Sequence, residues 1–196
     1  NTMVNFQELI YFLDRFSRQK ETLFLGIGNE GVIELLGFVY HVTTFQAELC
    51  FLPVSLRSFA QSLSFVDQIV SDKNLMTVME IKEAPQSILF DHTLADQQTT
   101  GKMVDLLTLI RCGVVSDYSF LKSLYRNFPT REALLQHSFS AFSQTLIDYY
   151  QSDSEQLREF GKVFEKAFFQ TEKGSLLSNS MKTMFGLLFE LGWNVT

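Results

Sequence analysis

The stretch TLFLGIGNEG, residues 22–31, decides how the first half of this chain folds. Residues 22–27 are typical of a short buried strand, and residues 28–31 form a turn whose residues tolerate positive φ. An apolar helix is expected next over residues 32–45, followed by a second buried strand over residues 47–52. Strand, glycine turn, helix and strand in this order predict one βαβ unit.

The regions on either side extend this unit. Phe6, Leu9, Leu13 and Phe16 repeat at intervals of three and four residues, which predicts an amphipathic helix at the start of the chain. After the second strand we expect a helix over residues 56–70, an ambiguous polar stretch, and a third strand over residues 87–90. Residues 1–93 are therefore predicted to form a partial α/β, Rossmann-like nucleotide-binding segment.

The second half of the chain has a different pattern. From residue 95 onward only amphipathic helices separated by Gly, Pro and Ser/Asp breaks are expected, so residues 94–196 are predicted to form a helical domain. The fold class is thus α/β followed by all-α. The boundaries expected are a helix end at Gly113, another before Pro129, a cap at Thr130, a capping box from Ser152 to Glu155, and a last helix ending at Gly192.

Composition excludes several classes of protein. The chain is 46% hydrophobic and 19% charged, which indicates a folded globular protein, and no apolar run is long enough for a membrane helix. The net charge of −6 and the scattered Lys and Arg residues argue against a nucleic-acid partner. Cys50 and Cys112 lie in apolar stretches and are expected to be buried thiols, so a reducing cytoplasm is the simplest location. The 20 Phe residues are expected to fill the core.

One motif suggests a cofactor. Gly26, Gly28 and Gly31 match G-x-G-x-x-G between a strand and a helix, a setting in which backbone amides approach a dinucleotide pyrophosphate. Glu30 argues against this reading because it adds a carboxylate beside that anion, and only Glu48 lies near the usual ribose-binding offset. NAD binding is left open.

Other catalytic patterns are missing. His41, His92 and His137 lie in separate segments, and neither cysteine is at metal-ligand spacing from them, so no metal site is expected. No serine lies in a G-x-S-x-G elbow, and neither cysteine has the sequence signature of an activated thiol. The residues alone therefore predict no complete catalytic site.

Several segments match motifs of a known family in the same order. Residues 21–38 are similar to a strand, a glycine triplet and a D-L-A-G-F helix start, and residues 51–56 are similar to F-x-x-V-P-T-T-L. Partial matches to V-L-I-D, E-V-I-K-Y-G-L-I-x-D and L-G-H-T-F-G-H follow at residues 87–91, 106–117 and 160–164. On these motifs the chain resembles the dehydroquinate synthase family of NAD- and zinc-dependent sugar phosphate cyclases. The resemblance implies an α/β nucleotide domain followed by an all-helical domain.

The same resemblance implies that key catalytic residues are lost. Members of the family use NAD to oxidise and re-reduce a ring alcohol, and a zinc ion held by one Glu and two His. In this chain Thr108 stands in place of that Glu, Lys162 and Lys166 stand in place of two helical histidines, and residues 178–180 replace a later H-G-E. Two ammonium groups repel a divalent cation, so zinc is not expected to bind.

Some polar chemistry remains by the same comparison. Gln61 replaces an Asp of the family, and Asp67 replaces the Lys of a G-G-K segment, which puts a negative charge where a phosphate-bearing substrate would bind. The remaining polar candidates for a catalytic role are Glu34, Lys73, Asn74 and Arg111.

The resemblance also implies that an N-terminal part of the nucleotide domain is missing here, either because the chain is a fragment or because it is a short form. Without that part, the sheet would expose an edge and an apolar surface. A protein partner or a homo-oligomer is therefore expected.

Three hypotheses about function follow. The first is a dehydroquinate-synthase-like protein that lacks activity by itself and serves as an accessory or interaction subunit. The second is a fragment of an active NAD-dependent cyclase or dehydrogenase. The third sets the resemblance aside and makes the chain an unrelated helical domain that binds a ligand or a protein.

Overall fold

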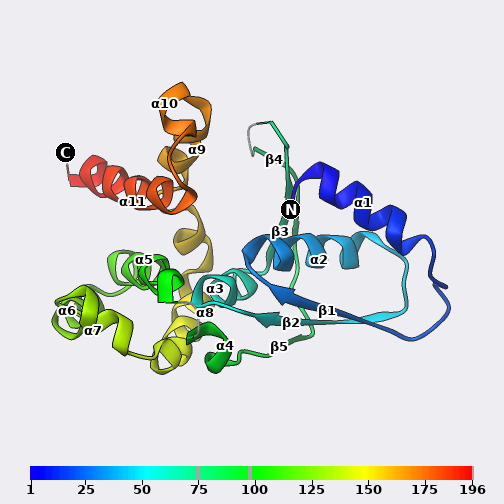
Figure 1. Ribbon diagram of the computed structural model, residues 1–196, viewed down its shortest axis with the longest axis horizontal. Coiled ribbons are helices and arrows are strands. Elements are labelled where there is room, and N and C mark those ends of the chain that lie inside the picture. Colours follow the sequence, from blue (N-terminus) through cyan, green and yellow to red (C-terminus); the bar gives the residue numbers. More distant parts are fainter. Residues whose placement is uncertain (74–75, 97–98, 196) are drawn as a thin grey trace. The chain divides into compact units, whose positions relative to one another are not determined.

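The computed structural model describes residues 1–196 except 74–75, 97–98 and 196, and it divides into two compact units, Asn1–Ala95 and Asp96–Thr196 (Figure 1). The elements of the first unit are α1 (Met3–Leu13), β1 (Thr22–Gly28), α2 (Glu30–Val42), β2 (Ala47–Pro53), α3 (Leu56–Leu63), β3 (Val66–Val70), β4 (Thr77–Lys82) and β5 (Ser87–Ile88), with α4 (His92–Asp96) at the junction. The second unit contains α5 (Thr99–Val115), α6 (Tyr118–Asn127), α7 (Arg131–Gln136), a 3-10 turn (Phe139–Phe142), α8 (Ser143–Glu159), α9 (Lys162–Gln170), α10 (Glu172–Ser175) and α11 (Asn179–Val195).

A parallel sheet forms the base of the first unit. β1 and β2 pair in parallel over their whole length, with Thr22 opposite Ala47, and the short β5 continues the sheet beside β2. α2 connects β1 to β2 and lies over them, as a parallel pair requires (Figure 1). The βαβ unit predicted from residues 22–52 is confirmed. The buried core between α2 and the sheet consists of Phe24, Ile33, Val39, Leu49 and Phe51.

A second, antiparallel sheet follows where a helix was expected. The prediction of one helix over residues 56–70 is wrong, because α3 ends at Leu63 and β3 begins at Val66. Phe65 between them has a φ of 53°, a left-handed conformation that is costly for a bulky residue and stops the helix. β3 then pairs with β4, which lies in the stretch that the sequence left ambiguous.

The second unit contains only helices among its described residues, so the predicted fold class, α/β followed by all-α, is confirmed. Two helix ends were predicted wrongly. α5 continues through Gly113, where a Cβ atom would lie 2.8 Å from Leu121 Cβ, and α11 continues past Gly192. Gly113 therefore allows α5 and α6 to approach closely and does not cap a helix.

Two expected caps have different outcomes. Thr130 does cap a helix, since its hydroxyl accepts a hydrogen bond from the Ala133 amide at 3.2 Å, but that helix is the short α7. Ser152 lies within α8, and its hydroxyl donates to the Tyr149 carbonyl at 3.1 Å. The next residue, Asp153, has a non-helical φ of −129° and ψ of 23°, so α8 is kinked close to the point where a new helix was expected. A further break lies at Gly161, whose φ is 82°.

No helix in the described part of the chain is long and apolar enough to cross a membrane.

Candidate functional site

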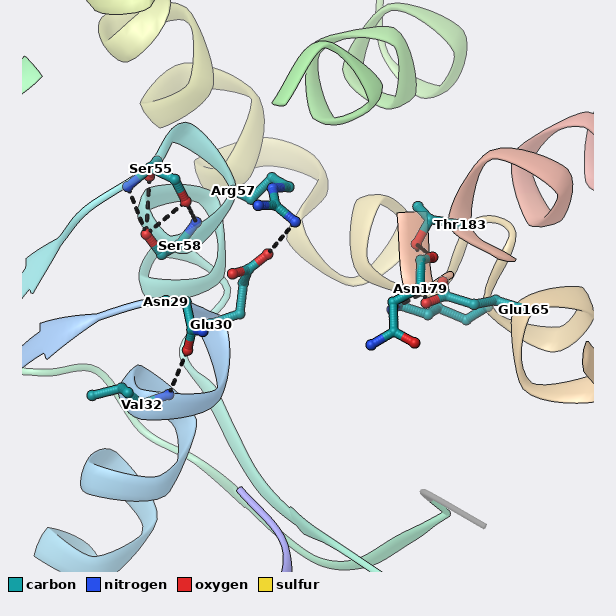
Figure 2. Close-up of polar contacts among 10 residues, drawn as sticks. Asn29, Glu30, Val32, Ser55, Arg57, Ser58, Glu165, Asn179 and Thr183 are labelled. Atoms are coloured by element: carbon teal, nitrogen blue, oxygen red, sulfur yellow. Dashed lines mark hydrogen bonds and ion pairs between the residues drawn. The ribbon is translucent and has the colours of Figure 1, made fainter. Parts of the chain in front are cut away.

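Two helix N-termini meet the ends of β1 and β2 in the first unit. The Asn29 side chain accepts a hydrogen bond from the Val32 amide at 3.3 Å and caps α2. Ser55 caps α3 through reciprocal hydrogen bonds with Ser58 at 3.0–3.1 Å (Figure 2). Because ligands of open α/β sheets bind at the carboxyl ends of the strands, this is the candidate site.

An ion pair joins the two helix starts. Glu30, the first residue of α2, points toward Arg57 of α3, and Arg57 Nη1 lies 3.3 Å from Glu30 Oε1 (Figure 2). Each side chain is about one-third exposed. A carboxylate at a helix N-terminus interacts favourably with the helix dipole, so Glu30 supplies the negative charge that this position attracts.

The three glycines of the motif differ in what they make room for. A Cβ atom on Gly26 would lie 2.9 Å from Leu36, and one on Gly28 would lie 2.8 Å from Val32. Both glycines therefore let α2 pack closely on β1. A Cβ atom on Gly31 would meet nothing nearer than 3.5 Å, so packing does not require that glycine.

Glu34, a candidate from the sequence, lies in a buried acidic cluster. Its carboxylate accepts hydrogen bonds from the Asn1 side chain and, at 3.0 Å, from Nε2 of the Gln68 side chain. Asp67 of β3 is 5% exposed and lies against Gly37, where a Cβ atom would be only 2.1 Å from Asp67 Oδ2. Burial raises the pKa of Asp67 to about 8, and the nearby charge of Glu34 adds to the rise.

The remaining candidates are spread over the chain. Lys73 lies on an exposed turn, where its amide donates to Ser71 Oγ at 3.3 Å, and Asn74 lies outside the described residues. Arg111 belongs to α5 in the second unit, and its Nε atom is buried with no hydrogen-bond partner. Within the first unit, Glu34 and the three glycines all belong to β1 or α2. Their catalytic and cofactor-binding roles stay predictions.

The residues at the positions that the resemblance assigns to zinc binding make other contacts in this structure. Thr108 is buried in α5, and Ser178 accepts a hydrogen bond from the Met181 amide at the start of α11. Lys162 Nζ lies 3.1 Å from Glu165 Oε2. The Thr183 hydroxyl donates to the other oxygen of this carboxylate at 3.2 Å (Figure 2).

These residues do not fit the zinc ion that the resemblance implies. The Lys162 ammonium group neutralises the Glu165 carboxylate. A protonated ammonium group has no lone pair and cannot be a metal ligand. Among the described residues, no group of three His, Cys, Asp or Glu side chains could hold a metal ion.

A dinucleotide fits the start of α2 poorly, because that helix end already has partners of its own. The Asn29 side chain accepts a hydrogen bond from the Val32 amide, and the Glu30 carboxylate lies at the same helix end. A pyrophosphate at that end would be repelled by Glu30.

Sequence reasoning missed Arg57. It has no motif of its own, and its pairing with Glu30 depends on two helix starts that are brought together by parallel strands. The neighbouring buried acids, Glu34 and Asp67, were singled out separately but not as a pair, because they come from different elements.

Solved structures with a similar fold include two synthases and a probable dehydrogenase. The 2-epi-5-epi-valiolone synthase from Streptomyces hygroscopicus, solved with NAD+ and Zn2+ bound, is 12% identical with a TM-score of 0.76, and the match covers 95% of this chain and 55% of that one. A 2-deoxy-scyllo-inosose synthase complexed with carbaglucose-6-phosphate, NAD+ and Co2+ is 13% identical with a TM-score of 0.64, covering 96% and 54%. A probable glycerol dehydrogenase from Sinorhizobium meliloti is 10% identical with a TM-score of 0.57, covering 95% and 60%.

The fold is dehydroquinate synthase-like. This confirms the fold that the sequence motifs implied, so the expectation of an unrelated helical fold is wrong. The ligand or protein binding named in that third hypothesis stays a prediction. At 10–13% identity the likeness concerns the fold alone. The chain spans little more than half the length of the two solved synthases that it matches. No family model and no curated protein matches its sequence.

Proposed function

We propose that this dehydroquinate synthase-like chain carries out no cyclase reaction by itself and serves as an accessory or interaction subunit. The observation that carries the proposal is the ion pair between Glu30 and Arg57 at the start of α2. That helix end is where backbone amides of an open α/β fold meet a dinucleotide phosphate. A carboxylate held there by a neighbouring guanidinium opposes the binding of a second anion.

The second unit supports the same proposal. Glu165 is buried, and its carboxylate is occupied by Lys162 and by the Thr183 hydroxyl. A buried carboxylate that is paired in this way is neutralised within the protein and needs no metal for charge balance. Because Glu165 lies on α9 and Thr183 lies on α11, these contacts link the two helices.

An interaction role also has support in the first unit. The side chains of Leu23, Leu25 and Ile27 on β1 are 57%, 47% and 53% exposed, on the face of the sheet opposite α2. Among the described residues, β1 pairs only with β2, so its other edge offers unpaired backbone groups. Parallel sheets are normally covered on both faces, so this surface favours a protein partner or a second copy of the chain. A cytoplasmic location stays a prediction.

Cofactor titration tests the proposal. NAD is titrated into the purified protein by calorimetry, and the metal content is measured after dialysis against zinc. We expect no saturable NAD binding and less than one metal ion per chain. Glu30→Gln, which removes the carboxylate but keeps the side-chain size, is expected to bind NAD more tightly than the wild type, whereas Glu21→Gln on the preceding loop serves as the control. Micromolar NAD affinity or stoichiometric zinc in the wild type would refute the proposal.

A second candidate function is a part of an active cyclase. Its support is that the chain matches only 54–55% of the solved cyclases, so a complete site would need residues that this chain does not supply. Release of inorganic phosphate from a sugar phosphate, measured with NAD and Zn2+ or Co2+, would favour this function. Activity that rises only when a second polypeptide is added would favour it further.

A further inference from the structure

One face of α6 carries aromatic and basic side chains that lie exposed on the second unit. Tyr118 and Tyr125 are 67% and 81% exposed, and Lys122 and Arg126 are exposed as well. Their spacing along the helix places all four within about 100° of its circumference. The Lys122 Nζ atom lies 4.7 Å from the centroid of the Tyr118 ring, so the charges and the rings are neighbours. We call the surface formed by these four residues the α6 basic face.

The opposite side of α6 holds the helix in place. It packs on α5 (Figure 1), where Leu124 is 3% exposed and a Cβ atom on Gly113 would lie 2.8 Å from Leu121 Cβ. Asp117 caps the helix, since its carboxylate accepts hydrogen bonds from two amides of the first turn at 2.8 and 3.2 Å. The residues of the α6 basic face are therefore not needed to hold the helix on the core.

The charge of this region is opposite to that of the chain. Residues 118–131 contain three cations, Lys122, Arg126 and Arg131, and no Asp or Glu, so the stretch has a net charge of +3 in a chain of −6. Glu132 on α7 is the first acid that follows. Within the part of the chain that the structure describes, Lys122 and Arg126 form no ion pair. Their charges are therefore available to a binding partner.

We propose that the α6 basic face is a docking surface for an acidic segment of a partner protein. Guanidinium groups match the two oxygens of a carboxylate, and Tyr and Arg are enriched among the residues that anchor protein interfaces. Nucleic acid is the weaker candidate, because three cations on an acidic chain neutralise few phosphates. The surface involves neither β1 nor the start of α2, so it goes beyond the function proposed above and does not depend on the absence of NAD binding.

An acidic peptide is the first probe. A fluorescein-labelled peptide of Glu residues interrupted by Leu is titrated with the purified protein, and binding is followed by fluorescence anisotropy. Saturable binding that weakens with added salt is expected. Lys122→Glu combined with Arg126→Glu should weaken it about tenfold or more, because two attractive contacts become repulsive. Lys20→Glu combined with Lys173→Glu, at exposed positions outside α6, changes the net charge equally and should bind the peptide like the wild type.

Tyr125→Ala tests the aromatic part of the surface. Because its ring is 81% exposed, the melting temperature should stay unchanged while the affinity for the peptide falls several-fold. A thymidine oligonucleotide of the same length tests nucleic acid and should bind more weakly than the peptide. The proposal is overturned if the wild type does not bind the peptide, if Tyr125→Ala binds it equally well, if the control pair loses as much affinity as the α6 pair, or if the oligonucleotide binds more tightly.

Discussion

Asp67 is the residue whose environment departs most from what its side chain prefers in water. It lies buried on β3 against Gly37 of α2, close to the carboxylate of Glu34. Burial is the main cause that raises its pKa from an ordinary value of 3.8 to about 8, and Glu34 is the second. At neutral pH the folded protein therefore holds a proton on Asp67 that the unfolded chain releases.

This proton makes stability depend on pH. Between about pH 4 and pH 8 the folded state binds more protons than the unfolded state, so the free energy of unfolding should fall as the pH rises through this range. Above about pH 8 both states have lost the proton, and the decline should level off. Asp67→Asn cannot ionise, and it should be more stable than the wild type at pH 8 by about 1–3 kcal/mol. Urea unfolding from pH 5 to pH 9 measures both effects.

An exposed acid provides the control for this experiment. Asp14 forms an ion pair with Arg18 at 3.6 Å at the surface, so Asp14→Asn should change stability by less than about 1 kcal/mol and keep the slope with pH. A wild-type stability that rises between pH 5 and pH 8 would contradict the assignment of the proton to Asp67.

At the scale of elements, the crossing of α9 and α11 depends on two glycines. Gly161 precedes α9 with a φ of 82°, and a Cβ atom on Gly186 of α11 would lie 2.5 Å from the Gly161 carbonyl oxygen. No side chain can relieve that contact, because the neighbouring atom belongs to the backbone. The two helices can therefore cross this closely only with glycine at residue 186.

Gly186→Ala tests this crossing. The added methyl group must push α11 away from α9, so we expect a loss of about 1–3 kcal/mol in the free energy of unfolding. Gly192→Ala is a control on the same helix, since a Cβ atom there meets nothing within 4 Å. It should instead stabilise the protein by about 0.5–1 kcal/mol, the usual gain for Ala over Gly inside a helix. Equal effects of the two changes, measured by urea unfolding, would show that the close crossing is absent.

At the scale of the whole molecule, the proposed interaction role rests on the exposed face of β1. Leu23, Leu25 and Ile27 point away from α2, and the strand contains no charged residue that would discourage pairing. In the absence of another protein, a second copy of the chain is the partner available to cover them.

Light scattering after size exclusion tests this expectation. The wild type should have a mass above the 22.5 kDa of one chain, and Leu25→Glu should shift it toward the monomer, because a charge at a buried apolar contact opposes association. Leu176→Glu changes a residue that is 85% exposed in the second unit and should leave the mass unaltered. A wild-type monomer that binds no apolar dye would refute a role for this face in assembly.

Much of the fold could be predicted from local patterns, and much of the candidate site could not. The βαβ unit follows from residues 22–52 because strand, glycine turn and helix signals are short-range. β3 was missed because its apolar residues also suit a helix, and the reversal at Phe65 is imposed by pairing with β4. The glycine motif predicted where β1 ends. The ion pair between Glu30 and Arg57 near that point could not be predicted in the same way, because its residues are 27 positions apart in sequence.

The sequence by itself determined the fold class, the order of α/β segment and helices, and the glycines that let α2 pack on β1, because each depends on residues that are neighbours in the chain. Only the tertiary structure decided which polar groups meet. It set Glu30 against Arg57, Asp67 beside Glu34, and Lys162 on Glu165. The physical reason is that charge and burial act through space, so their effect on binding and pKa depends on how distant elements pack.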